Sequence, residues 1–231
     1  MNYLFAENKE STGIRELDII MEGGFTKPGI VAIKGDVGKE MNYFALSFAS
    51  EVIKRGGLVF YNVSTTVPSD IEKKAEDMSM NIKTFVNDQL FFIDSYSGIS
   101  GQRDVNRHDI IVESPSLLNE LSLAINDALE KAKGKNFAFI FHTASAFLLH
   151  NEPASVVKFF QLNLGKIKTA GGIAILLIDK GTEQKDFISF VEYITDDYIT
   201  IDVKEGTGYL NISGINVSIP IRSTAVGVEI L

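Results

Sequence analysis

The chain has 231 residues, which is long enough for one α/β domain with a full core and rather short for two. It contains no cysteine, so disulfide frameworks, zinc fingers and thiol catalysis are excluded. Its formal net charge of −8 argues against nucleic-acid binding, because such proteins usually need a basic face to displace counterions from phosphates.

The lengths of the apolar stretches argue against a signal peptide and against a membrane span. Residues 1–10 carry charged side chains and lack the long apolar stretch of a signal peptide. The longest apolar runs, 137–141 and 173–178, are far too short to span a bilayer and are typical of buried strands. We therefore expect a cytoplasmic protein without a membrane span.

Strands and helices alternate along most of the chain. Apolar runs predict strands at 30–33, 58–63, 90–93, 137–141 and 173–178. Helical spacing predicts helices at 41–55, 68–80, 117–133, 154–169 and 186–194, with Ser69 or Asp70 as a cap of the second. This order is typical of an α/β fold, with a mostly parallel sheet and helices on both of its faces.

Two regions depart from this alternation. Residues 95–112 are polar and rich in Gly and Ser, which predicts a long loop or lid. From residue 198 onward the segments 198–203, 208–212, 217–221 and 228–231 alternate between apolar and polar residues, which predicts an antiparallel β-meander at one edge of the sheet. Since no Pro- or Ser-rich linker interrupts the chain, we expect a single domain over residues 1–231.

A family resemblance spans nearly the whole chain. The segment Thr12-Gly-Ile-Arg-Glu-Leu-Asp18, followed by Gly23-Gly24-Phe25, resembles the lead-in that precedes the P-loop in KaiC-like and RadA/FlaH-like ATPases. The D-x-Y-S turn at Asp94 and the Asp196-Asp197-Tyr-Ile segment are similar to later motifs of that family, in the same order. The resemblance implies a three-layer RecA-like fold, of the archaeal type, in a family that assembles as rings or filaments with ATP between subunits.

The phosphate-binding loop of this family has the pattern G-x-x-x-x-G-K-[ST], in which the Lys reaches the phosphates and the hydroxyl binds Mg²⁺. Here the corresponding segment is Gly35-Asp36-Val37-Gly38-Lys39-Glu40-Met41-Asn42. Aligned without a gap, Glu40, Met41 and Asn42 replace the last Gly, the Lys and the Ser/Thr. Aligned on Gly38-Lys39, the loop is two residues too short, and Glu40 takes the place of the hydroxyl. Both alignments predict a vestigial loop.

Glu40 is expected in the first turn of the following helix, where backbone N–H groups are free and the helix dipole is positive. A carboxylate there satisfies the helix from within the protein. It also repels a triphosphate, because two unit charges about 4 Å apart cost roughly 4 kcal/mol at an effective dielectric of about 20. Asp36 adds to this repulsion.

The other ATPase positions are changed as well. The family's Walker B strand ends in an Asp that supports Mg²⁺, whereas here the strand 137–141 is followed by His142 and Thr143. The family's catalytic Glu follows the second core strand, whereas here 64–67 has no carboxylate to activate a water. We expect no catalytic residue, and interpret His142 as a partly buried, hydrogen-bonded side chain rather than as part of a replacement site.

A metal or cofactor site is not expected. Asp94, Asp104 and Asp109 supply carboxylates, but their spacing fits no known ligand pattern. His108 lies in the same polar segment and is expected to face solvent.

Two functions are suggested by the resemblance and by the positions at which this chain departs from the family's motifs. The first is an inactive pseudo-ATPase that serves as a binding, regulatory or assembly module, with a protein partner or paralogue that the sequence does not identify. Monomer, homo-oligomer and subunit of an active paralogue's ring stay open. The alternative is a weak ATPase or a nucleotide-binding protein that holds ATP and Mg²⁺ through remodelled contacts of Lys34 or Lys39. DNA binding, implied by the RadA kinship, has the least support.

Overall fold

The computed structural model describes residues 8–36, 38–182, 184–204 and 207–231. Within these ranges, ten strands form one sheet in the order β12-β11-β10-β9-β3-β8-β7-β4-β5-β6, and β1 and β2 form a small separate sheet. The strands are β1 Lys9–Glu10, β2 Phe25–Thr26, β3 Gly29–Gly35, β4 Leu58–Val63, β5 Leu90–Asp94, β6 Ile110–Ile111, β7 Phe137–His142, β8 Ile173–Asp179, β9 Asp197–Lys204, β10 Thr207–Ile212, β11 Ile219–Thr224 and β12 Gly227–Ile230.

The main sheet is parallel in one part and antiparallel in the other. From β3 to β6 all neighbours pair in parallel. Strand β9 pairs in parallel with β3 and antiparallel with β10, and β10, β11 and β12 continue antiparallel. The predicted meander at one edge is therefore confirmed, and β9 is the strand at which the direction changes.

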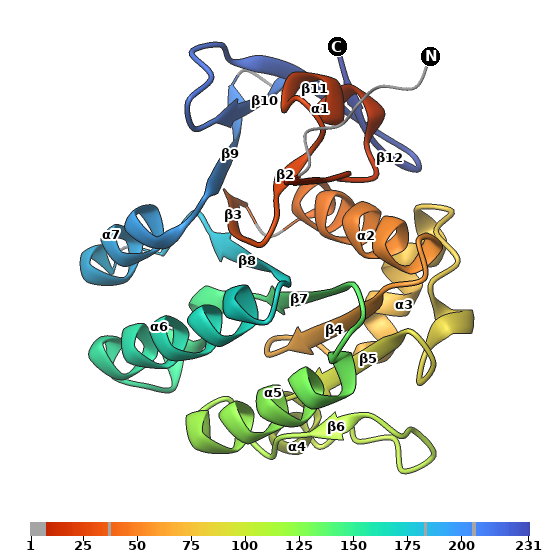
Figure 1. Cartoon of the computed structure of the whole chain (residues 1–231), viewed down its shortest axis with the longest axis vertical. Helices are drawn as coiled ribbons and strands as arrows, with labels where there is room; N and C mark the ends of the chain where they lie inside the picture. Colours follow the sequence, from red (N-terminus) through yellow and green to blue (C-terminus); the bar gives the residue numbers. More distant parts are fainter. Residues whose placement is uncertain (1–7, 37, 183, 205–206) are drawn as a thin grey trace.

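Helices cover both faces of the sheet, as Figure 1 shows. The helices are α1 Arg15–Ile20, α2 Lys39–Lys54, α3 Pro68–Asp77, α4 Ser97–Ser100, α5 Leu118–Ala132, α6 Pro153–Thr169 and α7 Lys185–Ile194, with short 3₁₀ segments η1 Lys83–Phe85 and η2 Ala144–Leu149. The predicted strands and long helices are confirmed, and their ends differ by a few residues.

The alternation of strand side chains creates two cores. Val31 and Ile33 of β3 pack in the core beneath α1, α2 and α3, whereas Ile30 and Ala32 pack in the core beneath α5, α6 and α7. Since successive strand residues point to opposite faces, an uninterrupted apolar strand supplies both cores. The three-layer α/β fold expected from the resemblance is thus confirmed.

The expected cap of α3 is wrong. The residue before the helix is Val67, Pro68 occupies the first turn, and no side chain caps the N-terminus. Pro is well suited to this position because its missing N–H would be unbonded there in any case. Asp70 instead accepts a hydrogen bond from Thr66 Oγ1 at 2.7 Å.

The expected loop or lid at 95–112 also needs correction, since it contains α4 and the edge strand β6. Arg107 anchors the segment: its guanidinium pairs with Glu72 of α3 at 2.7 Å and with Asp109 at 2.5 Å, and it lies 5.5 Å from the centre of the Phe92 ring. Asp109 is therefore an ion-pair partner of Arg107, and His108 is exposed as expected. This segment is tied to α3 over part of its length.

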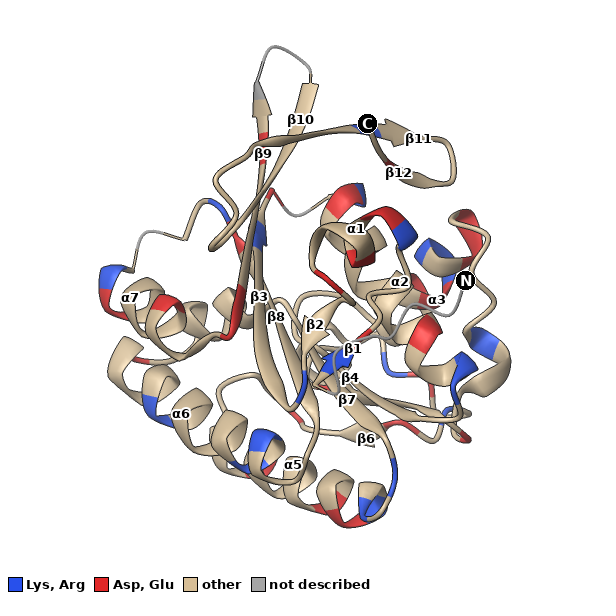
Figure 2. Ribbon diagram, turned by 45° about the horizontal axis from the view of Figure 1, so that its top comes forward, with Lys and Arg blue, Asp and Glu red and all other residues tan. Residues whose placement is uncertain are grey.

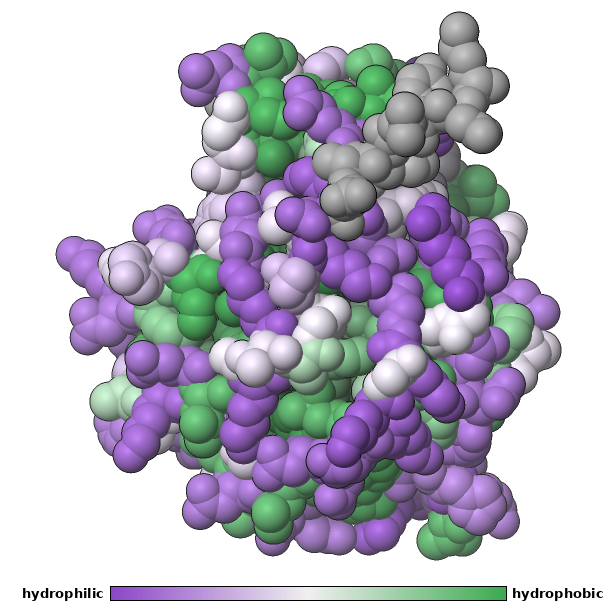
Figure 3. Space-filling view, in the orientation of Figure 1, coloured by the Kyte–Doolittle hydropathy of each residue, from purple (hydrophilic) through white to green (hydrophobic). Residues whose placement is uncertain are grey.

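The surface is mixed in charge and largely polar. Lysines and acidic residues occur together on α3, α5 and α7 (Figure 2). Apolar surface gathers near β9 and β10 and over α5 to α7 (Figure 3), where Leu123, Leu162 and Tyr193 are exposed. Among the described residues, no helix combines the length and apolar character that a bilayer crossing requires.

Candidate functional site at the β3–α2 turn

The turn between β3 and α2 lies at the carboxyl end of a central strand. Gly35 closes β3 and pairs with Asp179 of β8, and α2 begins at Lys39 after an extended Gly38. Asp36 is exposed, and Val37 lies outside the described residues. In open α/β sheets, ligands bind at this edge. The segment predicted as a vestigial phosphate-binding loop therefore lies at the sheet edge where a ligand site is expected in this class of fold.

The base of the turn is filled by apolar side chains of the protein. A Cβ built on Gly35 would lie 3.1 Å from Cβ of Ile201 and 3.5 Å from Sδ of Met41. Met41 is 1 % exposed and belongs to the core beneath α2. A side chain at position 35 would therefore be tight against Ile201 of β9, whereas its contact with Met41 would be an ordinary van der Waals contact.

The first turn of α2 is bonded to the hairpin formed by β11 and β12. Lys39 Nζ donates to the carbonyl oxygens of Thr224 and, at 2.6 Å, of Ala225. Ser223 Oγ donates to Glu40 Oε1. One turn further along α2, the Tyr43 ring lies against Gly227, and a Cβ there would clash with it. The C-terminal hairpin therefore covers the start of α2.

The expected role of Glu40 as a partner of free helix N–H groups is wrong. Glu40 does lie in the first turn of α2, but the N-terminus has no side-chain cap, and its carboxylate accepts from Ser223. Side chains at the N-cap and at the third helical position are the ones that reach these N–H groups. Those positions hold Gly38 and Met41, which have no side-chain oxygen.

Asn42 and His142 meet beneath the turn. Asn42 Nδ2 donates to the carbonyl oxygen of Gly38 at 2.6 Å, and Asn42 Oδ1 lies 2.9 Å from His142 Nε2. The Asn42 oxygen can only accept, so Nε2 carries the ring proton in this network. Both side chains are buried, at 4 % and 2 % exposure. The prediction that His142 is hydrogen-bonded is consistent with this geometry, and the side chain is more fully buried than the partial burial expected.

Burial controls the protonation of His142. Burial, together with the positive charge of Lys74, lowers the pKa of His142 to about 4. The imidazole is therefore neutral near neutral pH, and its Nδ1 has no hydrogen-bond partner among the described residues. A neutral ring next to an amide offers no anionic oxygen to a cation.

Hydroxyl groups occupy the ends of β4 and β7. Ser64 Oγ donates to the carbonyl oxygens of His142 and Thr143, both at 3.1 Å, and Thr65 Oγ1 lies 3.4 Å from Thr143 Oγ1. The peptide bond between His142 and Thr143 is cis. No carboxylate stands at these two strand ends. In the described part of the chain, no group of three His, Asp or Glu side chains is arranged to hold a metal ion.

The comparisons with known proteins bear on this geometry. Residues 10–222 match the family described as ATPase: KaiC. The chain therefore belongs to the KaiC-like ATPase family. A sequence relative is UPF0273 protein MK0039 of Methanopyrus kandleri, 23% identical over 208 residues, which cover 89% of this chain and 81% of the relative.

A solved structure shares the KaiC-like fold of this chain. The KaiC-like protein PH0186 of the hyperthermophilic archaeon Pyrococcus horikoshii OT3 superposes with a TM-score of 0.74 over 96% of this chain and 98% of its own, at 14% identity. At this identity the likeness speaks for the fold alone.

The lead-in of this KaiC-like chain has a structural role. Asp18 of α1 accepts hydrogen bonds from Ser11 Oγ at 2.6 Å and from both the backbone N and Oγ1 of Thr12 at 2.7 Å. Gly13 has a φ of +80°, and a Cβ there would lie 2.5 Å from the carbonyl oxygen of Ser47 in α2. The motif therefore closes its own turn and packs it against α2.

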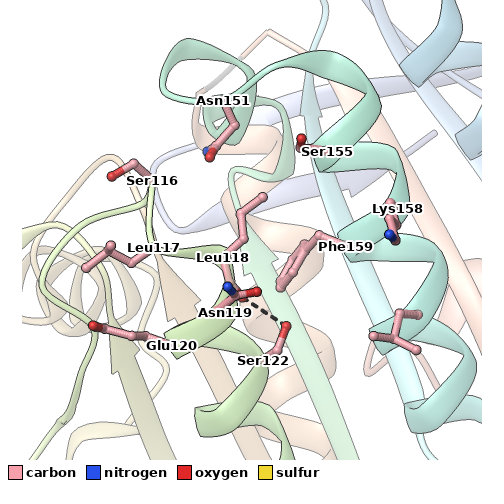
Figure 4. Close-up of a pocket in the computed structure, with 11 residues that line it drawn as sticks. Ser116, Leu117, Leu118, Asn119, Glu120, Ser122, Asn151, Ser155, Lys158 and Phe159 are labelled. Carbon is pink, nitrogen blue, oxygen red and sulfur yellow. Dashed lines mark hydrogen bonds between the residues drawn. The ribbon is translucent and has the colours of Figure 1, made fainter.

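Three cavities of similar volume lie on the described part of the KaiC-like fold. One of about 620 Å³ lies between α2, α3 and the β11–β12 turn. One of about 520 Å³ lies at the carboxyl ends of β4, β7 and β8, beside Asp179 and Ser145. One of about 600 Å³ lies between α5 and α6, where Lys158 and Glu120 line it together with Phe159 (Figure 4).

Sequence reasoning missed the partners of the turn. It did not identify the contact between Asn42 and His142 or the hairpin contacts of Lys39. It also did not identify Lys74 and Asp179, each of which lines one of the cavities described above. A signal for the first was present, because Asn42 and His142 both follow the carboxyl ends of predicted parallel strands, and those ends share one edge.

Proposed function

We propose that this KaiC-like domain does not hydrolyse ATP and acts as a binding, regulatory or assembly module. The observation that carries the proposal is the hydrogen bond between Asn42 and His142. In the alignment without a gap, Asn42 stands in place of the Ser/Thr that binds Mg²⁺, and His142 in place of the Walker B Asp. This alignment is supported by the fact that Asn42, and not Glu40, faces His142.

The chemistry of that pair favours loss of the Mg²⁺ site. Mg²⁺ prefers oxygen ligands in octahedral geometry and is usually held by carboxylates and phosphates. Here a neutral imidazole and an amide bond to each other, and the amide nitrogen is engaged with Gly38. Binding Mg²⁺ at the imidazole or at Asn42 Oδ1 would compete with the hydrogen bond between them within a buried region.

The phosphate contacts are also unfavourable for ATP. Met41, in the gapless position of the phosphate-binding Lys, is buried and apolar. Lys39 is bonded to hairpin carbonyls, and Asp36 and Glu40 bring negative charge to the loop. The hydroxyl groups of Ser64 and Thr65 stand in place of the carboxylate that would activate a water. We infer that binding and hydrolysis are lost together.

A module of this kind retains the fold as a surface for other proteins. We propose a single cytoplasmic domain over residues 1–231 that binds a protein partner or an active paralogue, or associates with copies of itself. Assembly in the ATPases depends on nucleotide at subunit boundaries, so assembly of this chain should be independent of ATP. Light scattering after size exclusion, with and without Mg·ATP, tests this.

The alternative function is nucleotide binding through remodelled contacts, with weak or no hydrolysis. The cavity of about 620 Å³ beside Lys39 is the observation that favours it. Calorimetric titration with Mg·ATP separates the two. We expect no heat and no thermal stabilisation, since a ligand that binds only the folded state must stabilise it.

Micromolar Mg·ATP binding would overturn the proposal in favour of the alternative, and phosphate release at a steady rate would overturn the loss of hydrolysis. The matched control is the double variant Asn42→Thr with His142→Asp, which restores two oxygen ligands at the proposed Mg²⁺ position. A gain of Mg²⁺ affinity in this variant alone supports the assignment of these two positions.

A further inference from the structure

The cavity at the carboxyl ends of β4, β7 and β8 is lined by hydroxyl groups, apolar side chains and a carboxylate. Its volume of about 520 Å³ lies within the range of small-molecule sites, about 300–1,000 Å³. It shares no lining residue with the cavity beside Lys39, and no described residue of the β3–α2 turn lines it. It is therefore a separate place for a ligand on this sheet edge.

The carboxylate in this lining belongs to Asp179, the last residue of β8, which is half-buried. Its Oδ1 accepts a hydrogen bond from the backbone N of Gly181 at 2.9 Å, whereas Oδ2 has neither a hydrogen bond nor an ion pair within the described residues. The next residue, Lys180, pairs with Asp202 at 2.6 Å instead. Since no Lys, Arg or His in the described part of the chain lines the cavity, the charge of Asp179 is uncompensated there.

Hydroxyl groups next to this carboxylate can accept further hydrogen bonds. Ser145 lies beside Asp179, because Ser145 Oγ accepts from the backbone N of Asp179 at 3.1 Å. Thr143 Oγ1 lies 3.4 Å from Thr65 Oγ1, and both threonines line the cavity. Ser145 and Thr143 are buried, at 7% and 3% exposure. A hydroxyl oxygen has two lone pairs, so each of these two side chains retains an acceptor site for a ligand.

The 3₁₀ segment η2 gives the cavity an apolar wall. Ala146, Leu148 and Leu149 of this segment line it. Leu149 is 79% exposed, so a ligand that covers it would remove apolar surface from water, which is favourable. The wall adjoins a polar region rather than enclosing it, and this arrangement suits a ligand with one charged end and an apolar body.

The lining decides the charge of that ligand. An anion would be repelled by Asp179 and would find no cation among the described lining residues. A divalent metal ion prefers several oxygen ligands with charge, and the described residues hold no group of three His, Asp or Glu side chains that could supply them. A primary ammonium has one positive charge and three donors, which match one carboxylate and two hydroxyl acceptors.

We propose that this cavity binds a small primary amine with an apolar body. The ammonium group pairs with Oδ2 of Asp179 and donates to the hydroxyl oxygens of Ser145 and Thr143, and the body packs on Leu148 and Leu149. Binding is non-covalent. The site involves neither Lys39 nor the bond between Asn42 and His142, so it goes beyond the proposed function and does not depend on it.

The test titrates benzylamine and its neutral isostere benzyl alcohol into the full chain by calorimetry, at constant pH and ionic strength. We expect benzylamine to bind about tenfold more tightly, which corresponds to about 1.4 kcal/mol. Asp179→Asn keeps an oxygen that can accept from Gly181, and should lower the benzylamine affinity to that of benzyl alcohol, which should not change. Asp186→Asn, which removes an exposed carboxylate of α7 outside the cavity, is the matched control and should change neither affinity.

A second variant tests the apolar wall. Leu149→Ser alters a largely exposed side chain and should weaken both probes alike, by about threefold, because the lost contact is apolar. Urea denaturation of each variant verifies that it is folded. Absence of benzylamine binding, equal affinity for the two probes, or unchanged benzylamine affinity in either Asp179→Asn or Leu149→Ser would overturn the site. Mg·ATP hydrolysis would overturn the proposed function and leave this proposal standing.

Discussion

The two turns that lead into α1 and α2 are built in opposite ways. In the lead-in, Asp18 accepts hydrogen bonds from Ser11 and Thr12, which lie no more than seven residues away along the chain. In the β3–α2 turn, Asn42 bonds to His142, 100 residues away, and Lys39 bonds to the hairpin 185 residues away. The first turn is stable through its own sequence, whereas the second depends on parts of the chain that arrive much later.

The largest expected effect comes from breaking the local turn. Asp18→Ala removes three hydrogen bonds and leaves the backbone N–H of buried Thr12 without a partner, so we expect a loss of about 3 kcal/mol in the free energy of unfolding. Urea denaturation measures it. Glu16→Ala, an exposed carboxylate on the same helix, is the control and should cost less than about 0.5 kcal/mol. Equal effects of the two variants would contradict a structural role for the lead-in.

A pH dependence of similar size should come from the long-range turn. The pKa of His142 is lowered to about 4 by burial and by Lys74, against about 6.5 in the unfolded chain. Below pH 6.5 the unfolded chain therefore takes up a proton that the folded chain does not. Stability from this group should fall by about 3 kcal/mol as the pH falls from 6.5 to 4.

The control for this pH dependence is His142→Gln, whose amide nitrogen can still donate to Asn42. Urea denaturation across the same pH range isolates the imidazole as the difference between the two chains, because the carboxylates titrate in both. Parallel stability curves for the two chains would show that His142 is not held neutral by the fold.

A smaller loss is expected when the partner of His142 is removed. Asn42→Ala leaves Nε2–H of a buried ring without an acceptor, which should cost about 2 kcal/mol. In the His142→Leu background the same change should cost less, because no polar group is then left unpaired. This double-mutant cycle, measured by urea denaturation, tests the coupling, and additive effects would contradict it.

The smallest effect concerns the hairpin. Lys39→Met removes the two donors to Thr224 and Ala225 near the surface and should cost about 1 kcal/mol or less. Faster amide hydrogen exchange across residues 219–230 should be the clearer signal. Lys54→Met, at the exposed far end of α2, should leave that exchange unchanged. Unchanged exchange in both variants would show that the hairpin does not depend on Lys39.

The same contrast explains what the sequence could predict. The strands around Val31 and Phe139 and the helix around Leu121 follow from apolar periodicity, which is a local property. The lead-in resemblance is local as well. Partners such as Thr224 for Lys39, or Glu72 for Arg107, depend on which strands become neighbours and on side-chain geometry, and periodicity does not encode these.

The missing cap of α3 and the bond of Glu40 to Ser223 have a similar origin. A carboxylate or hydroxyl near a helix start predicts a cap, but the exact N-cap residue decides which side chain reaches the free N–H groups. A shift of two or three residues placed Gly38 and Val67 at those positions. The exact residue at which each of these helices begins is set by packing of the helix against the sheet.

The separation between Lys39 and its hairpin partners has a consequence for synthesis on the ribosome. At about 5–20 residues per second, the 185 residues between Lys39 and Thr224 take on the order of ten seconds to translate. Until then the nascent α2 presents its first turn, with Lys39 and Glu40 uncovered, to the contents of the cell. The contacts of Lys39 that close the β3–α2 turn can therefore form only after Thr224 and Ala225 have been translated.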